Sequence, residues 1–268
     1  MKLSKPFGEL DIKLDRFFTV EIISVILLAL CAVAVFFIYR GRENAKLKKM
    51  RREFSANVSH ELKTPLTTIY GYADMLLNGM VKDDKDVADF LAKIRRESSR
   101  MLELIDDIIR LSEWDEETVQ EEAEEFDLFT LGSEVIEILT PKAEEKNVSL
   151  SIVGGVTAVF ANKRMIYEVL SNLIDNAIKY NKPNGSVRVS LSQRDKTIIE
   201  VIDTGIGIPK EYHSRIFERF FRVDNSRAKQ TGGTGLGLSI VKHIVQHHKG
   251  DISVESKEGA GTKVTIKI

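Results

Sequence analysis

The chain has 268 residues, a formal net charge of −1 and a single cysteine. This length accommodates one large domain or two small ones. The balanced charge supplies no basic field, so nucleic acid is not an expected partner, and one cysteine excludes both a disulfide framework and a cysteine-based zinc site.

Residues 17–39 form an almost wholly apolar run, FFTVEIISVILLALCAVAVFFIY. As a helix this run would extend about 35 Å, enough to cross a bilayer. A cleaved signal peptide is the alternative, because Ala32-Val33-Ala34 resembles a cleavage site, but the apolar run continues beyond it. The basic segment 40–53 places the carboxyl side in the cytoplasm, leaving residues 1–16 as a short outer tail. The sequence therefore predicts a single-pass membrane protein.

Apolar residues recur every three or four positions on both sides of a short polar turn at residues 78–84. One stripe runs from Leu47 to Leu76 and the other from Val87 to Ile108, which predicts two amphipathic helices. Two helices joined by a short loop form an antiparallel hairpin, and two such hairpins bury their seams in a four-helix bundle. We therefore expect residues 54–112 to form an all-α domain that dimerises.

Residues 113–125 carry eight acidic side chains and are expected to be a solvated linker. Beyond them, residues 126–268 mix helical and strand-like patterns. The helical patterns lie at 128–146, 163–180 and 236–247. The strand-like runs lie at 148–153, 187–191, 197–202, 252–255 and 263–268. Strand pairs with helices segregated from them predict an α+β two-layer sandwich, with one sheet and one helical layer.

The helix predicted at 163–180 carries amides and cations at helical spacing. In NLIDNAIKY, the side chains of Asn172 and Asn176 share one face with Lys179 or Tyr180. Carboxamides and an amine on one face can hold a hydrated cation and the phosphates that it bridges. Alone, this pattern describes a polar outer face as readily as a site.

Two glycine-bearing segments follow. DTGIGIP begins directly after a strand, where the carboxylate of Asp203 could accept a hydrogen bond from an exocyclic amine. Alone, this pattern describes a strand-to-loop turn as often as a site. TGGTGLGLSIV, residues 231–241, is a glycine-rich loop that opens a helix, and backbone amides at a helix start favour phosphate. Between them, residues 210–230 are too irregular and polar for a core, which is typical of a lid over a phosphate site.

In this order, the three clusters resemble the ATP-binding domain shared by sensor histidine kinases, gyrase, Hsp90 and the MutL repair proteins. The stretch SHELKTPL, residues 59–66, distinguishes among these relatives. It resembles the phosphoacceptor box of two-component sensor histidine kinases, which the others lack. The resemblance covers residues from about 46 to 268.

The resemblance implies that His60 accepts the γ-phosphoryl group of ATP and that Glu61 assists as base or orienting group. It implies that Thr64 positions the water that removes phosphate from the partner regulator, and that Arg222 reaches the γ-phosphate. Mg²⁺ would be held by Asn172 and Asn176. The implied nucleotide-binding residues are Asn172, Asn176, Lys179, Tyr180, Asp203, Gly205, Gly207, Gly233, Thr234, Gly235, Leu236 and Gly237.

The resemblance also implies a homodimer in the bacterial inner membrane whose catalytic part is cytoplasmic. It would pass phosphate to an aspartate on the receiver domain of a separate response regulator, and also dephosphorylate that regulator. The short outer tail cannot fold into a sensor, so we expect sensing in the membrane, by a partner protein or by a region outside this chain. A membrane-tethered scaffold that sequesters a regulator is the competing hypothesis, and a phosphatase-dominant enzyme is the third.

Pro65 stands inside the phosphoacceptor stretch, where its ring crowds the carbonyl of Glu61. An interior proline costs about 3 kcal/mol in an ordinary helix. We hypothesise that it creates a bend one turn after His60. Movement of the membrane helix could then change how His60 faces the ATP-binding domain.

Overall fold

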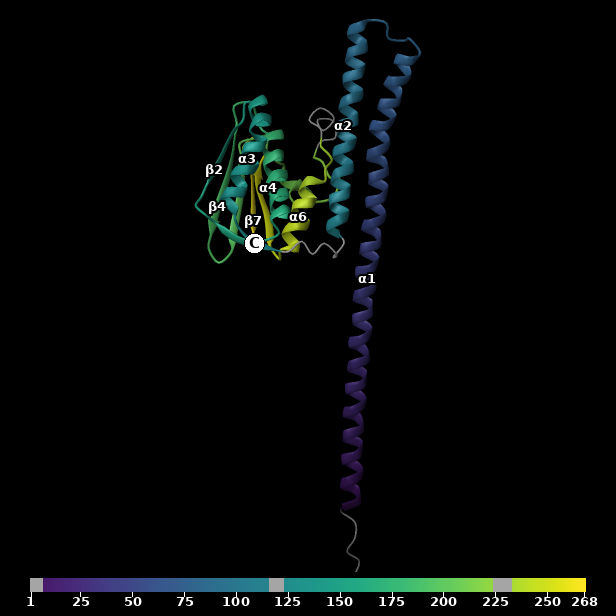
Figure 1. Cartoon of the computed structure of the whole chain (residues 1–268). Helices are drawn as coiled ribbons and strands as arrows, with labels where there is room; N and C mark the ends of the chain where they lie inside the picture. The colour runs from purple at the N-terminus through teal and green to yellow at the C-terminus, as the bar shows by residue number, and fades with distance from the viewer. Residues whose placement is uncertain (1–6, 116–122, 224–232) are drawn as a thin grey trace, which may run out of the picture. The chain divides into compact units, whose positions relative to one another are not determined.

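The computed structural model describes residues 7–115, 123–223 and 233–268, although the side chains of most of residues 7–51 and of residues 113–115 lie outside that set. The chain divides into two compact units, Met1–His60 and Glu61–Ile268. Figure 1 traces the elements of both units from the amino to the carboxyl terminus.

Helix α1 runs without interruption from Phe7 to Leu77, so the predicted apolar run at 17–39 is helical throughout. Among the residues that the structure describes, no helix is both long enough and apolar enough to cross a membrane. Most side chains of residues 17–39 lie outside that described set, and the membrane span stays a prediction.

Helix α2 runs from Asp84 to Asp115 and follows a turn at the predicted place, which confirms the helical hairpin. Aromatic packing fixes the pairing of the two helices. The ring of Tyr72 on α1 meets that of Phe90 on α2 edge to face, with centroids 5.0 Å apart. The ammonium of Lys93 lies over both rings and pairs with Asp89 at 2.6 Å. These contacts hold the end of α1 against the first turns of α2.

The remainder of the second unit contains a five-stranded sheet in the order β2-β4-β5-β7-β6. Only β2 and β4 are parallel, and the other neighbours are antiparallel. The strands are β2 (Ser149–Val153), β4 (Ser186–Gln193), β5 (Thr197–Asp203), β6 (Asp251–Lys257) and β7 (Gly261–Lys267). A 3₁₀ turn, η1, spans Lys210–Tyr212 after β5.

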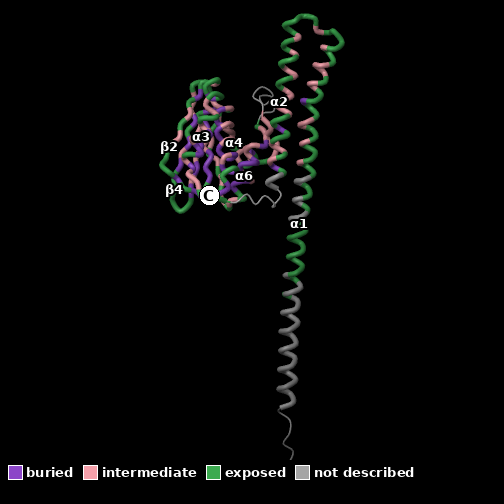
Figure 2. Tube along the Cα trace, in the orientation of Figure 1, coloured by how far each residue is buried: buried purple, intermediate pink, exposed green. Residues whose placement is uncertain are grey.

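Helices α3 (Leu128–Glu145), α4 (Lys163–Lys179) and α6 (Gly237–His247) cover one face of this sheet (Figure 1). The core lies between the two layers, where buried residues line the inner side of each helix (Figure 2). Alternate residues of β4 and β5 are buried, as a sheet with one covered face requires. The predicted α+β two-layer sandwich is therefore confirmed.

Two short strands were not predicted. β1 (Glu124–Asp127) and β3 (Ala158–Ala161) pair antiparallel as a separate two-stranded sheet. The last residues of the segment expected to be a linker therefore lie in a strand. Asp127 ends β1 and caps α3, because its carboxylate accepts the backbone N–H groups of Phe129 and Thr130.

Candidate functional site

Helix α4 supplies the amide face of the site. Its amino end is capped by the buried side chain of Asn162, whose Oδ1 accepts the N–H of Met165 at 2.9 Å. Asn172 and Asn176 are half-buried one turn apart. The start of α6 presses on them, since a Cβ at Gly237 would lie 2.6 Å from Asn172 Oδ1 and 3.7 Å from Asn176 Nδ2. A side chain at position 237 would therefore displace the amide of Asn172.

Two cations meet where α4 ends. Burial lowers the pKa of Arg222, and it lowers the pKa of Lys179 to about 8. The positive charge of Arg222 adds to the lowering of the Lys179 pKa, and the carboxylate of Asp175 opposes it. Arg222 Nη2 is the one buried side-chain nitrogen or oxygen that lacks a hydrogen-bond partner among the described residues. An unpartnered buried nitrogen beside a second cation fits a site for an anionic ligand.

The glycine-rich loop lies against these cations. Gly233 has φ +118°, and a Cβ there would collide with Lys179 Nζ and lie 3.5 Å from Arg222 Nη2. Gly235 has φ +75° and packs on the backbone of Phe220, whose N–H donates to its carbonyl at 2.9 Å. Of the predicted lid at 210–230, residues 224–230 lie outside the described set. The loop thus presents backbone to the cations, as phosphate binding needs.

Asp203 ends β5 beside the next glycine turn. Its Oδ1 accepts the N–H groups of Gly205 at 2.8 Å and Thr262 at 3.2 Å. Burial raises the pKa of this carboxyl, and the two backbone hydrogen bonds oppose the rise. Both bonds use Oδ1, so Oδ2 keeps its acceptor capacity for a ligand amine. Gly205 is buried against the Tyr180 carbonyl, which joins this turn to the end of α4.

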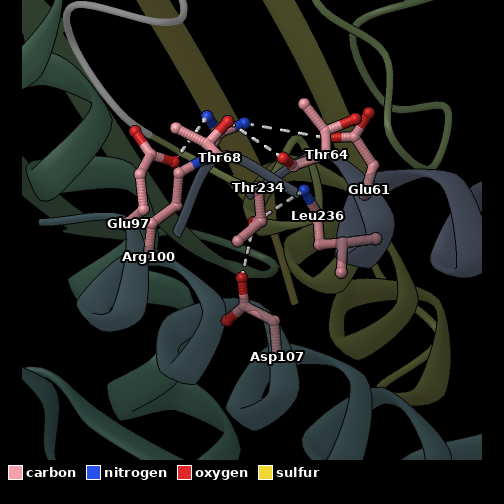
Figure 3. A network of polar contacts seen from close by, with 8 residues as sticks. All are labelled: Glu61, Thr64, Thr68, Glu97, Arg100, Asp107, Thr234 and Leu236. Atoms are coloured by element: carbon pink, nitrogen blue, oxygen red, sulfur yellow. Dashed lines mark hydrogen bonds and ion pairs between the residues drawn. The ribbon is translucent and has the colours of Figure 1, made fainter. Parts of the chain in front are cut away.

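The predicted acceptor stretch lies on α1. His60 has an exposed side chain and belongs to the first compact unit. Glu61 is half-buried in the second unit, where its Oε2 lies 3.7 Å from Arg100 Nη2 on α2 (Figure 3). Thr64 is exposed, and its carbonyl accepts the hydroxyl of Thr68 at 3.1 Å. The structure thus holds the candidate base in an ion pair.

Contacts from α2 to the sandwich were missed by sequence reasoning. Thr234 Oγ1 donates to Asp107 Oδ2 at 2.5 Å and accepts the N–H of Leu236 at 3.2 Å (Figure 3). Arg110 Nη1 donates to Glu168 Oε2 at 2.8 Å. One signal was available, because Glu168 precedes Asn172 by four residues and therefore shares its face of α4. The pairing partners on α2 carry no such signal.

The chain matches two family models. Residues 50–117 match the His Kinase A (phospho-acceptor) domain, and residues 161–268 match the histidine kinase-, DNA gyrase B-, and HSP90-like ATPase. The chain is similar to sensor histidine kinase WalK of Bacillus subtilis, with 39% identity over 237 residues. That match covers 86% of this chain and 38% of WalK, so the chain spans well under half of that relative.

Two solved structures are similar over most of the chain. Acinetobacter baumannii histidine kinase AdeS has a TM-score of 0.63 and 27% identity, covering 78% of this chain and 96% of that one. Histidine kinase ThkA, in a complex with the response regulator protein TrrA, has a TM-score of 0.64 and 27% identity. It covers 81% of this chain, which in turn covers 60% of ThkA. With both family domains present in order, the chain belongs to the two-component sensor histidine kinases.

Proposed function

We propose that this chain is an ATP-dependent protein-histidine kinase in which His60 is the phosphoryl acceptor. A ring nitrogen of His60 would attack the γ-phosphorus, the bond to the β,γ-bridging oxygen would break, and ADP would leave. Glu61 would hydrogen-bond the other ring nitrogen and offset the positive charge that develops on the imidazole. Family membership and an exposed His60 beside a positioned carboxylate support this assignment.

The observation that carries the proposal is the unpartnered buried nitrogen of Arg222 beside Lys179 and Gly233. Two half-buried cations against a glycine backbone would form a site for several phosphate oxygens. Arg222 would stabilise charge on the transferring group, while Lys179 and the loop amides would hold the phosphates. Asp203 would accept the adenine amine through its remaining acceptor capacity.

The amide face of α4 fits a hard cation. Asn172 and Asn176 offer carboxamide oxygens, and Gly237 lets the start of α6 approach Asn172 without a clash. We therefore assign Mg²⁺ to these two residues. When bound, it would neutralise charge on the phosphates. The assignment is tested by Mg²⁺-dependent nucleotide binding in the wild type and in Asn176→Asp.

Labelling with γ-³²P ATP tests the kinase activity. Wild-type protein incubated with Mg²⁺ should acquire label that is stable in alkali and lost in acid, as phosphohistidine is. His60→Ala should abolish the label, whereas His247→Ala, an exposed histidine at the end of α6, should retain it. Nucleotide binding without label in the wild type would instead support the scaffold alternative.

We further propose transfer of the phosphoryl group from His60 to an aspartate on the receiver domain of a separate response regulator. The ThkA–TrrA complex supports a partner of this class. Purified receiver domains from the same organism, mixed singly with labelled protein for one minute, should include one that takes the label. Thr64 is exposed one turn after His60 on α1, which supports regulator dephosphorylation as a second activity. Thr64→Ala should abolish dephosphorylation and leave labelling of His60 intact.

We propose a homodimer anchored in the bacterial inner membrane by residues 17–39. The family domain of the hairpin and exposed apolar side chains on both of its helices, including Leu66, Leu91 and Leu102, support dimerisation. Light scattering of detergent-solubilised protein should give a dimer mass, and alkaline carbonate should leave the chain in the membrane fraction. A monomer mass would contradict the proposed dimer, and release by carbonate would contradict the proposed membrane anchor.

A further inference from the structure

Four charged residues of α2 form one polar stripe that faces the candidate nucleotide site. Arg100, Glu103, Asp107 and Arg110 are spaced by three or four, so they share one face of the helix. Leu104 and Leu111 lie one turn on either side of Asp107 and are 4% and 1% exposed. Asp107 and Arg110 are half-buried between these leucines, and each contacts a residue of the sandwich.

Three of the four members act on residues of the site or of α4 beside it. Asp107 accepts the hydroxyl of Thr234 at 2.5 Å (Figure 3). The Glu103 carboxylate opposes the lowering of the pKa of Lys179. Arg110 pairs at 2.8 Å with Glu168, whose side chain is 9% exposed.

Asp107 therefore lies at the glycine-rich loop, where phosphate charge is expected, and Glu103 stands one turn before it on α2. Thr234 belongs to the glycine-rich loop, and Lys179 lies against Gly233 of the same loop. The hydroxyl of Thr234 is fully engaged, since it donates to Asp107 and accepts from Leu236. Burial raises the pKa of Asp107, and the hydrogen bond from Thr234 opposes that rise. A carboxylate at this loop repels a triphosphate and competes for the same donors.

We propose that Glu103 and Asp107 are a built-in competitor of the nucleotide's phosphate groups, and that the Arg110–Glu168 pair fastens it in place. This inference rests on the proposed kinase function. ATP binding and docking of the stripe then exclude one another, so any signal that shifts α2 changes nucleotide affinity. The carboxylates would compete only with the phosphate groups of the nucleotide, and adenine recognition at Asp203 would not change.

Charge removal tests the competitor in the full chain. The variants are Asp107→Asn and Glu103→Gln, singly and combined, with Asp106→Asn as the matched control because Asp106 is exposed beside them. The readout is the equilibrium Kd for trinitrophenyl-ATP with Mg²⁺, with unlabelled ATP and adenosine as competing ligands. The combined variant should bind ATP about fivefold more tightly or better, with an unchanged affinity for adenosine. Equal or weaker ATP binding overturns the proposal, and so does an equal gain for adenosine.

Charge reversal tests the fastening pair. Arg110→Glu and Glu168→Arg should each tighten ATP binding, and the double variant should return it to the wild-type value. The side chain of Arg110 is 41% exposed, so its replacement should not unfold the protein. If the Glu168 variant does not fold, Arg110→Gln decides the question alone, with Arg95→Gln at an exposed position as its control. Unchanged affinity in Arg110→Gln contradicts the fastening role. Failure of the kinase proposal is separate, because wild-type protein would then neither bind ATP nor acquire label.

Discussion

His248 Nε2 accepts the backbone N–H of Asn162 at 3.2 Å and so joins the carboxyl end of α6 to the amino end of α4. The other ring nitrogen, Nδ1, lies 2.8 Å from the carbonyl of Ile244. Since a carbonyl only accepts, Nδ1 carries the proton and the ring is neutral when both bonds are formed. A protonated ring cannot accept from Asn162. The two helices that carry the amide face and the glycine loop are thus joined by an uncharged histidine.

Acid should weaken this junction. Burial lowers the pKa of His248 from 6.5, the ordinary value. Above 6.5 the ring is neutral in the folded and the unfolded chain, and its contribution is fully present. As the pH falls below 6.5 the unfolded chain takes up the proton first, so the free energy of unfolding decreases. Thermal melts at pH 7.5 and 5.0 should show a smaller pH-dependent loss in His248→Gln than in the wild type. An identical loss in both proteins would contradict the role of His248, and His247→Gln serves as the control.

The lowered pKa of Lys179 leads to a second prediction, in which the affinity for ATP decreases as the pH rises. With a pKa of about 8 in the ligand-free protein, its ammonium loses its proton as the pH rises from 7 to 9. Affinity for ATP should fall over that range because the neutral amine no longer attracts phosphate. Lys179→Met should bind weakly at every pH and show a flat profile. A wild-type affinity that is constant from pH 7 to 9 would rule out Lys179 as a phosphate ligand.

Gly237→Ala should damage the amide face without unfolding the domain. The new methyl group would lie 2.6 Å from Asn172 Oδ1 and displace that side chain. We expect Mg²⁺-dependent ATP affinity to fall about tenfold or more, comparable to 1.4 kcal/mol. Gly71→Ala is the control, because nothing lies within 4 Å of a Cβ at that position in α1. Isothermal titration would measure both, and an unaffected affinity in Gly237→Ala would show that the close packing is not needed for binding.

Pro65 is buried inside the uninterrupted helix α1, so it does not end the helix. Thr67 and Thr68 bond the carbonyls of Lys63 and Thr64 through their hydroxyls, and such bonds tend to bend a helix. Pro65→Ala should stiffen this turn and shift the ratio of His60 labelling to regulator dephosphorylation. Both rates should be measured in one membrane preparation. A ratio equal to that of the wild type would end the hinge hypothesis.

Most helices and strands could be predicted from hydrophobic periodicity, because the period of an amphipathic helix or an alternating strand is visible in a short stretch of sequence. β1 and β3 escaped notice since each has four residues and exists only through pairing with the other, more than thirty residues away. Asn172, Asn176 and Lys179 were recognisable from helical spacing and the resemblance. The Asp107–Thr234 and Arg110–Glu168 contacts join positions 127 and 58 residues apart. No local pattern encodes such partners, which only the tertiary structure brings together.

Helix α2 ends at Asp115 and β1 begins at Glu124, so eight residues join them. A chain of this length reaches at most about 30 Å even when fully extended. Such a tether gives the stripe an effective concentration in the millimolar range at the nucleotide loop, whatever the abundance of the protein. For a given position of α2, the proposed competition between stripe and nucleotide would therefore depend on the ATP concentration and not on the abundance of the protein, so a cell could not relieve it by making more of the kinase.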